Sequence, residues 1–315
     1  YRALEKIGPC SHQKLAKEAN VDERYLREWL SSNAAMGYVG YNAEEDEFAL
    51  SPEQAALFSH EGEPTCMQGF FQAVVGQFAT HELAVNTFKT GEGRAWDDHH
   101  SCCFCGTDRF FRPGYAASLT SDWIPALTGV EAKLQVGAKI ADVGCGLGSS
   151  SILMASAYPN SIVCGFDYHL SSIEKAIQSA HREKLTNISF SQVLAKELPG
   201  NDYDLVCIFD ALHDMGDPVG AAKRIKSVLK PGGTFMVVEP LAGDSLEENM
   251  NLLSGIMYGF STTICVPVSR SQEVGLCLGA QAGEKRISKV LKEAGFSKIK
   301  RVAETPGNMV LEAIA

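Results

Sequence analysis

Three glycines at alternate positions follow an acidic residue in the segment Asp142-Val143-Gly144-Cys145-Gly146-Leu147-Gly148. A second acid, Asp167, follows the apolar run 161–166. Glycines let the backbone of a turn approach a ligand closely, and an acid at the end of the second strand can hold ribose hydroxyls. The order strand, glycine turn, helix, strand and acid predicts a nucleotide-binding α/β unit. A glycine turn used only for packing is the alternative.

The position of Asp142 discriminates between nucleotide ligands. Its carboxylate would repel the pyrophosphate of a dinucleotide cofactor and attract an ammonium group. Dinucleotide folds also prefer a third glycine where this chain has Ser149. S-adenosylmethionine (SAM) has both an ammonium group and a ribose. We therefore expect SAM as the cofactor and S-adenosylhomocysteine (SAH) as its product.

His213 is the candidate general base. It follows the predicted strand 204–209, at the carboxyl edge of the sheet, where α/β proteins bind their ligands. An imidazole can accept a proton at neutral pH, as methyl transfer to a hydroxyl requires. Asp214 or Asp210 would orient the ring. The alternatives are a histidine that only stabilises the following helix or only positions the substrate.

Aromatic and charged side chains are candidates for the remaining contacts. We expect Tyr115 to reach the SAM carboxylate and Arg112 to pair with an acid on cofactor or substrate. The expected acceptor-site residues are Phe110, Arg112, Trp123, Tyr258 and Glu273. For the aromatic members, packing in the core is the alternative.

A histidine- and cysteine-rich segment does not predict a metal site. His99, His100, Cys102, Cys103 and Cys105 lack the paired spacing of zinc ligands. We expect a solvated lid loop over 91–106 and no bound metal.

Alternation of strand and helix patterns positions these residues from about 139 onward. Strands are predicted at 138–143, 162–166, 187–191, 204–209, 233–238, 297–303 and 308–314. Helices are predicted at 147–157, 170–182, 217–229 and 282–294, with an insertion at 245–280. Before this domain we expect one long helical segment over 64–90 and another over 107–127, interrupted near Pro113.

The first sixty residues predict a winged helix. Ser11 and Asp22 can cap two helices, and a hairpin is expected between 38 and 50. This segment carries ten acidic and six basic residues. Because a DNA-binding surface must neutralise phosphates, we expect dimerisation here rather than DNA binding.

Residues 138–240 resemble the core of the class I SAM-dependent methyltransferases. The glycine loop, Asp167 and the turn Leu229-Lys230-Pro231-Gly232-Gly233 match that family. His213-Asp214-Met215-Gly216-Asp217 resembles the "HDWSD" pattern that carries the catalytic histidine in plant-type O-methyltransferases. Further stretches at 98–100, 110–115, 213–218 and 279–284 are similar to bacterial methyltransferases with an N-terminal winged helix and to small-molecule O-methyltransferases. With the resemblance included, the expected cofactor-binding set is Asp142, Gly144, Cys145, Gly146, Gly148, Asp167, Tyr168, Ala195, Lys196, Asp210 and Tyr115.

Composition narrows the class of protein further. The 315 residues have a net charge of −10, which disfavours nucleic acid as a partner. The ten cysteines follow no disulfide framework, and no long apolar run predicts a membrane span. We expect a cytoplasmic protein. Its first residues lie inside a predicted helix, so we expect that the natural N-terminus is missing.

The sequence as a whole predicts a Rossmann-like α/β fold with a seven-stranded, mostly parallel sheet. We expect a winged-helix dimerisation domain at 1–60, a helical linker and lid at 61–130, and a SAM-binding domain at 131–315. The expected activity is methyl transfer from SAM to a small molecule, with oxygen as the acceptor atom and with His213 and Asp214 as catalytic residues. Nitrogen, sulfur or carboxylate acceptors are the first alternative, and a SAM-binding DNA-associated regulator is the second.

Overall fold

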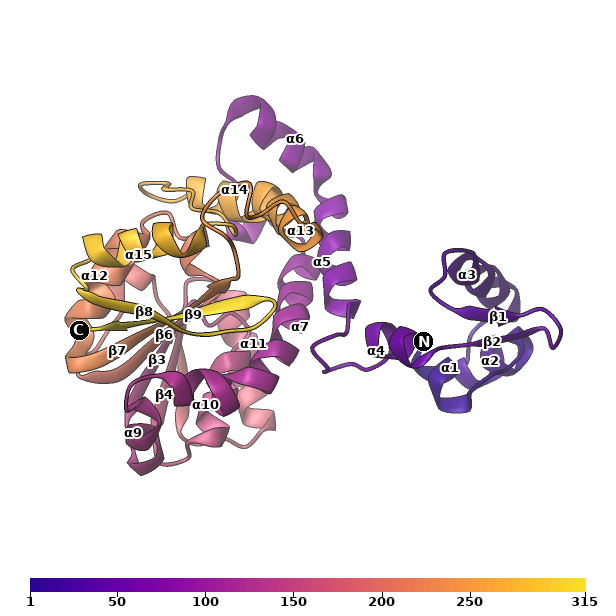
Figure 1. Cartoon of the computed structure of the whole chain (residues 1–315), viewed down its shortest axis with the longest axis horizontal. Coiled ribbons are helices and arrows are strands. Elements are labelled where there is room, and N and C mark those ends of the chain that lie inside the picture. The colour runs from indigo at the N-terminus through magenta and orange to yellow at the C-terminus, as the bar shows by residue number, and fades with distance from the viewer. The chain divides into compact units, whose positions relative to one another are not determined.

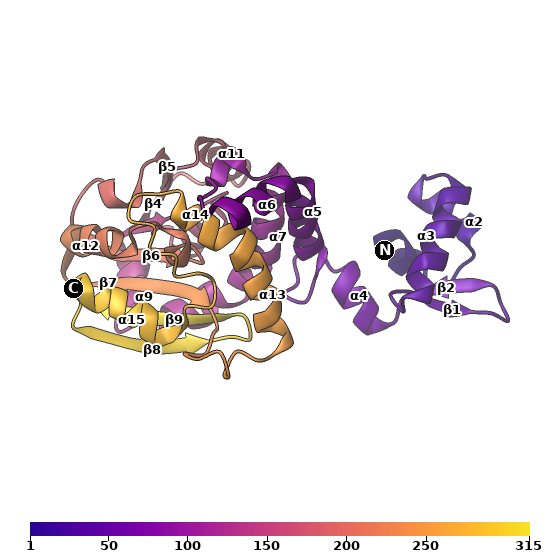
Figure 2. The ribbon, with the colours of Figure 1, turned by 90° about the horizontal axis from the view of Figure 1, so that it is seen from above.

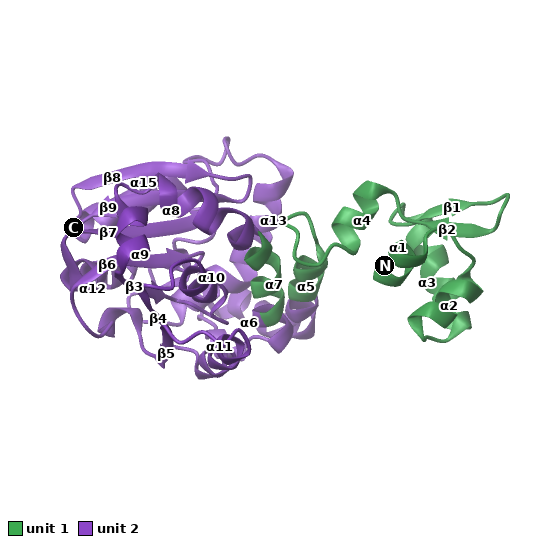
Figure 3. Ribbon diagram, turned by 90° about the horizontal axis from the view of Figure 1, so that it is seen from below, with its two compact units in different colours: residues 1–74, 105–113 green, residues 75–104, 114–315 purple.

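The computed structural model describes all residues, 1–315, and divides into two compact units (Figure 3). Unit 1 comprises residues 1–74 and 105–113, and unit 2 comprises residues 75–104 and 114–315. Helices α5 (Gln68–Ala79) and α7 (Ser101–Ser118) contribute residues to both units.

Unit 1 begins with the winged helix that the sequence predicts. Its elements are α1 (Arg2–Ile7), α2 (His12–Ala19), α3 (Glu23–Ala35), β1 (Gly40–Asn42), β2 (Glu47–Ala49) and α4 (Pro52–Phe58). Ser11 and Asp22 accept hydrogen bonds from backbone amides at the starts of α2 and α3, so both predicted caps are confirmed. β1 and β2 pair as an antiparallel hairpin.

Unit 2 is built on a seven-stranded sheet in the order β5-β4-β3-β6-β7-β9-β8. The strands are β3 (Lys139–Val143), β4 (Ile162–Asp167), β5 (Ile188–Gln192), β6 (Tyr203–Phe209), β7 (Leu229–Pro240), β8 (Lys298–Glu304) and β9 (Asn308–Ile314). The strands from β3 to β7 are parallel, and β9 runs antiparallel to both β7 and β8. Figure 2 shows β5 and β8 at opposite edges of this sheet. The predicted α/β fold and its seven strands are confirmed.

Helices cover both faces of the sheet. The helices of unit 2 outside α5 and α7 are α6 (His81–Thr90), α8 (Ile124–Ala126), α9 (Val130–Val136), α10 (Ser149–Ala157), α11 (Leu170–Arg182), α12 (Pro218–Val228), α13 (Leu252–Phe260), α14 (Val266–Arg270) and α15 (Gly283–Glu293). Figure 1 shows α12 and α15 on one side of the sheet and α9 and α10 on the other. Because both faces are covered, the central strands are apolar along their length, and Val206, Ile208, Phe235 and Val237 are fully buried.

The region before the sheet differs from the sequence prediction. The segment 64–90 contains two helices, α5 and α6, rather than one long helix. The expected solvated loop over 91–106 is wrong in part, because 96–98 form a 3-10 turn and α7 already begins at Ser101, where the His100 side chain caps it. Helix α7 also continues through Pro113. Pro113 is buried, so tertiary packing offsets the lost backbone hydrogen bond, a cost of about 3 kcal/mol.

One helical stretch is long and apolar enough to cross a membrane, which the sequence analysis did not expect. It spans Leu252–Arg270 and combines α13, the π-turn Ser261–Cys265 and α14. A core helix of a globular domain meets the same criteria, so this is weak evidence for a membrane span. Ile264, Cys265 and Val268 pack in a cluster with Cys103, so part of this apolar surface, 39% of the stretch, is buried inside unit 2.

Close packing between α5 and α7 predicts a glycine requirement at position 76. A Cβ atom there would lie 2.7 Å from the backbone nitrogen of Cys103. We expect Gly76→Ala to lower the free energy of unfolding by about 1–3 kcal/mol, because backbone has to move. Thermal unfolding measures this loss. Gly255→Ala in α13, where a Cβ meets nothing within 4 Å, is the matched control. Equal melting temperatures for the two variants would contradict the packing argument.

Candidate active site

The glycine loop between β3 and α10 has the backbone that its sequence predicts. Gly144, Gly146 and Gly148 have positive φ angles of 73°, 54° and 83°. A Cβ at Gly144 would also lie 3.0 Å from the Ala211 side chain, which follows β6. The loop is therefore held close to the carboxyl edge of the sheet. Its backbone has a conformation that residues other than glycine rarely adopt.

Asp142 lies at the base of this loop and is completely buried. Its Oδ2 accepts hydrogen bonds of 2.6 Å from the hydroxyls of Ser150 and Ser151. Its Oδ1 is buried and accepts none. Burial raises the pKa of this carboxyl to about 6. A buried carboxylate with one free oxygen and no basic partner fits the ammonium group of SAM.

Asp167 ends β4 and is tied to the same loop. Its Oδ2 accepts from the Gly146 amide and its Oδ1 from the His169 amide, both at 2.9 Å. Burial raises the pKa of this carboxyl as well. Each carboxylate oxygen keeps a second lone pair, so Asp167 is held in a position from which it can accept ribose hydroxyls. Tyr168, the next residue along, is partly exposed.

Asp210 follows β6 in the left-handed conformation, with φ of 47°. Its carboxylate accepts a 2.6 Å bond from the Tyr115 hydroxyl and bonds of 2.8 and 3.0 Å from the Asn308 amide. Burial, followed by the nearby Glu239 carboxylate, raises the pKa of Asp210 to about 7. The Tyr115 hydroxyl thus donates to Asp210 within the protein, and its expected contact with the SAM carboxylate stays a prediction.

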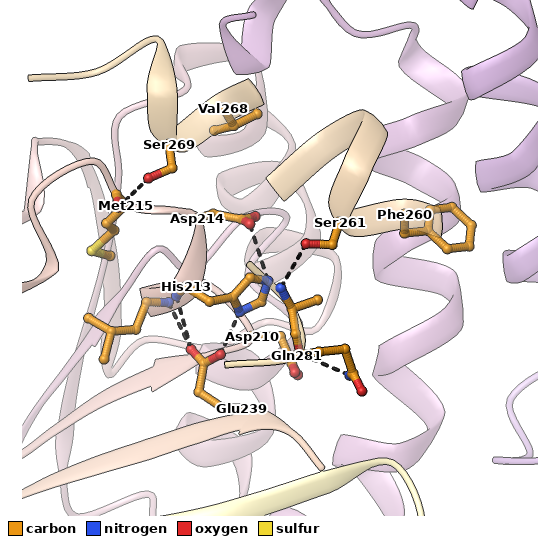
Figure 4. A network of polar contacts seen from close by, with 12 residues as sticks. Asp210, His213, Asp214, Met215, Glu239, Phe260, Ser261, Val268, Ser269 and Gln281 are labelled. Carbon is orange, nitrogen blue, oxygen red and sulfur yellow. Dashed lines mark hydrogen bonds and ion pairs between the residues drawn. The ribbon is translucent and has the colours of Figure 1, made fainter. Parts of the chain in front are cut away.

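His213 lies between two carboxylates just beyond β6 (Figure 4). Its Nδ1 is 2.5 Å from Oε2 of Glu239, whose Oε1 accepts from the Leu212 amide. Its Nε2 is 3.1 Å from Oδ1 of Asp214, an ion pair by distance without hydrogen-bond alignment. The imidazole is 3% exposed. Burial lowers the pKa of His213, but Glu239 and Asp214 outweigh it and hold that pKa well above its usual value.

A possible metal-ligand cluster surrounds the same histidine. Ligand atoms of His213, Asp214 and Cys265 lie within 4.8 Å of one another. Nitrogen, oxygen and sulfur donors of this kind suit zinc. Burial raises the pKa of the Cys265 thiol to about 12, and the expected absence of a bound metal stays a prediction. The histidine- and cysteine-rich segment assembles no comparable group, since His99 contacts backbone carbonyls and Cys103 lies in an apolar cluster.

Each of the residues expected near the adenine and the acceptor makes contacts with other side chains of the protein. Ala195 and Lys196 lie in the 3-10 turn 195–197, and Lys196 forms ion pairs with Asp217 and the exposed Glu273. Trp123 is 1% exposed and packs against Tyr115 as part of the core. Tyr258 lies in α13, where its hydroxyl accepts from Asn249.

Phe110 and Arg112 belong to unit 1. Phe110 packs near Phe70 and Phe111, and Arg112 lies 3.5 Å from Asp108 on the same helix. Their contribution to acceptor binding stays a prediction.

Sequence reasoning missed three residues of this site. Glu239 is an acid at the end of a buried parallel strand, the same signal that identified Asp167, so the sequence contained enough to find it. Asn308 and Cys265 come from the start of an antiparallel strand and from a π-turn. No spacing rule connects either of them to the glycine loop.

Comparison with known proteins defines the class. Residues 134–295 match the family described as "Methyltransferase domain", and residues 1–60 match an "Rv2258c-like winged HTH domain". The chain belongs to the methyltransferase domain family, and its fold is that of the class I SAM-dependent enzymes.

Individual relatives cover different parts of the chain. The sterol 24-C-methyltransferase erg6 of Aspergillus fumigatus is 27% identical over 81% of this chain and 60% of its own length. The chain thus spans about three fifths of that relative. Mitomycin 7-O-methyltransferase has a similar fold, with a TM-score of 0.71, 19% identity, and coverage of 98% of this chain and 88% of that one. Human N-acetylserotonin methyltransferase, solved in complex with SAM, has a TM-score of 0.66 and 16% identity, with coverage of 98% of this chain and 87% of that one.

The environment of Asp142 predicts opposite effects of Asp142→Asn on binding and stability. We expect affinity for SAH to fall by about tenfold or more, because a neutral amide attracts the ammonium group less strongly. The pKa of Asp142 is about 6 when folded, above its ordinary value of 3.8, so the carboxyl destabilises the fold as pH rises through that interval. The variant should therefore gain melting temperature at pH 8 relative to wild type. Calorimetric titration and thermal unfolding measure the two effects.

Asp204→Asn is the control. Burial acts to raise the pKa of Asp204, but hydrogen bonds from Lys230 and from the Lys139 amide outweigh it and lower that pKa. We expect this variant to lose stability at neutral pH and to keep its affinity for SAH. Unchanged SAH affinity in Asp142→Asn would remove Asp142 from the cofactor site.

Proposed function

We propose that the protein transfers a methyl group from SAM to an oxygen atom of a small organic molecule, with His213 as the general base. The observation that carries this proposal is the array Glu239–His213–Asp214 at the carboxyl edge of the sheet, next to the glycine loop. One structural neighbour supports an oxygen acceptor, since mitomycin 7-O-methyltransferase is named for one, whereas the sterol 24-C-methyltransferase relative is named for a carbon acceptor.

Different residues beside His213 bind different parts of SAM. Bound SAM supplies a methyl group activated by a positively charged sulfur. The glycine loop brings backbone close to the cofactor, the free Oδ1 of Asp142 takes its ammonium group, and Asp167 takes its ribose. Asp210, fixed by Tyr115 and Asn308, adds negative charge to the same edge.

His213 handles the proton of the acceptor. A hydroxyl with a pKa of about 10 is mostly neutral at pH 7, so a base must take its proton as the new bond forms. Nε2 is the accepting atom, and Asp214, which is only partly buried, rotates aside to admit the hydroxyl. Glu239 at Nδ1 orients the ring and stabilises the imidazolium that results.

Amine, thiolate and carboxylate acceptors need less help from a base. The Glu239 carboxylate at Nδ1 raises the basicity of the His213 ring. A hydroxyl acceptor requires such a base, whereas a nucleophile that is already ionised does not, so this contact favours an oxygen acceptor. A screen of methyl transfer from labelled SAM to phenols, hydroxy acids, amines and thiols would separate these classes.

The contact between Glu239 and His213 predicts an unusual pH dependence. Because the pKa of His213 is raised, the fraction of neutral base increases with pH above the ordinary histidine range. We expect kcat/KM for methyl transfer to rise along an acid limb centred above pH 6.5. Glu239→Gln removes the negative neighbour, so the limb should move to lower pH by about one unit, and the plateau rate should fall about tenfold. Initial rates between pH 5 and 9 measure both changes.

His213→Gln tests the base itself and is the companion variant. Its amide can still donate to Glu239 but cannot take a proton, so we expect kcat to fall about 10²–10⁴-fold while SAH still binds. His181→Gln at the exposed end of α11 is the control for substitution of a histidine. A flat pH profile in wild type, or full turnover in His213→Gln, would exclude the base role.

The winged helix supports association of two chains rather than DNA binding. Its ten acids outnumber its six basic residues, and α3 exposes Tyr25 (81%) and Trp29. Exposed aromatic side chains of this kind are enriched at protein interfaces. We propose a homodimer formed through this domain. None of the ten cysteines forms a disulfide, which supports the proposed cytoplasmic location.

Tyr25→Glu tests the dimer. We expect wild type to sediment at about twice its chain mass of 34.0 kDa and the variant to sediment as a monomer, because the charge would have to be buried at the interface. Lys17→Glu, on the exposed face of α2, is the control and should remain dimeric. A monomeric wild type at micromolar concentration, or salt-dependent binding to duplex DNA, would contradict this proposal.

A further inference from the structure

Arg94 is a buried cation with most of its donors unused. It lies between α6 and the 3-10 turn 96–98, in unit 2, and is 4% exposed. Its Nη2 donates to Oγ1 of Thr80 at 2.7 Å and to the Asp98 carbonyl at 3.0 Å. Nε and Nη1 are buried and have no hydrogen-bond partner. The carboxylate of Asp98 acts on the Arg94 charge but forms no ion pair with it. Burial lowers the pKa of Arg94 from its ordinary value.

An unpaired guanidinium inside a protein costs free energy that a structural role alone does not recover. Arginine is rarely buried without a partner, because its charge and its five donors lose their hydration. Two hydrogen bonds from one nitrogen leave the other two nitrogens uncompensated. Buried, unsatisfied donors on a charged group therefore point to an anion that is bound during function.

A second unsatisfied group lies on the neighbouring helix. Gln77 precedes Thr80 by one turn and donates through Nε2 to the Cys103 sulfur. Its Oε1 is buried and accepts no hydrogen bond. Arg94 donates to the Thr80 hydroxyl, one turn after Gln77, so the two groups share one neighbourhood. Together they offer donors for an anion and an acceptor for a hydroxyl or amine beside it.

This polar neighbourhood is connected to the proposed base through one layer of side chains. Cys103 packs in an apolar cluster with Cys265, and Cys265 lies within 4.8 Å of the His213 and Asp214 ligand atoms. Trp96 joins that cluster, with its ring 5.1 Å from Phe104 and 5.7 Å from His99. The polar neighbourhood of Arg94 and Gln77 therefore borders, at Cys103, a cluster of apolar and aromatic side chains.

We propose that Arg94, assisted by Gln77 and Thr80, binds a carboxylate on the methyl acceptor. The acceptor is then a small organic acid, with an aromatic or apolar body, that also carries the hydroxyl to be methylated. This assignment rests on the proposed function, because it places the hydroxyl toward His213 and the carboxylate toward Arg94. A guanidinium suits a planar carboxylate, to which it can donate two parallel hydrogen bonds.

Benzoate and benzamide test the carboxylate site, since they share a ring and a size but differ in charge. Binding to the full chain, saturated with SAH, is measured by calorimetry. We expect wild type to prefer benzoate by about tenfold or more, and Arg94→Met to lose that preference. Arg270→Met, which removes an exposed arginine near the same loop, is the matched control and should keep it. No preference in wild type, or an unchanged preference in Arg94→Met, overturns the proposal.

Stability separates ligand binding from a structural role. Replacing an unpaired buried cation by an apolar side chain should leave the melting temperature of Arg94→Met without ligand equal to that of wild type or higher, with SAH affinity unchanged. A fall in both quantities would show that Arg94 only supports the fold. If methyl transfer does not depend on His213 but wild type still prefers benzoate, the proposed function is overturned and the carboxylate site stands. If methyl transfer depends on His213 but wild type does not prefer benzoate, the carboxylate site is overturned and the proposed function stands.

Discussion

Burial of one carboxylate on each of four neighbouring strands is the constraint on which the rest of the site depends. Asp142, Asp167, Asp210 and Glu239 lie at or just beyond the carboxyl ends of β3, β4, β6 and β7, which are adjacent in the sheet. Parallel strands bring these ends to one edge. Burial raises the pKa of the first three carboxyls, so their ionised forms are unfavourable at this edge until a cation binds beside them.

The donors that hold these carboxylates are mostly neutral. Ser150 and Ser151 serve Asp142, and Tyr115 and Asn308 serve Asp210. A lysine or arginine in their place would satisfy the charge permanently and compete with a cationic ligand. Neutral donors fix the geometry and leave the charge to be balanced by what binds, so the arrangement favours a cofactor with a positive sulfur and an ammonium group. His213 is the exception, and its partner Glu239 is the acid that the proposed function uses in catalysis rather than in cofactor binding.

Most of the sheet could be predicted from sequence because each strand has a continuous apolar run and each connection has its own signal. The glycine loop and Asp167 were found for the same reason, since their spacing is local. Glu239 could have been found by asking which other buried strands end in an acid. Asn308 and Cys265 could not, because their place in the site depends on strand order and on a π-turn, which no short-range pattern encodes. The path of α7 through Pro113 was missed because packing overrode a local helix-breaking signal.

The charge asymmetry of unit 2 bears on how an acceptor would be oriented. The acidic edge repels an anionic substrate, so a carboxylate on the acceptor would keep its hydroxyl away from His213 unless something held the carboxylate elsewhere. Arg94 is a buried cation without an ion pair, and the apolar cluster that contains Cys103 and Cys265 lies between its neighbour Gln77 and His213 in the chain of contacts. Attraction at one end and repulsion at the other would align a hydroxy acid in a single direction, with its hydroxyl toward Nε2. A neutral substrate would feel neither force, and its orientation would rest on shape alone. The unpaired state of Arg94 is then a specificity device, kept at a cost in stability because any permanent acidic partner would neutralise it.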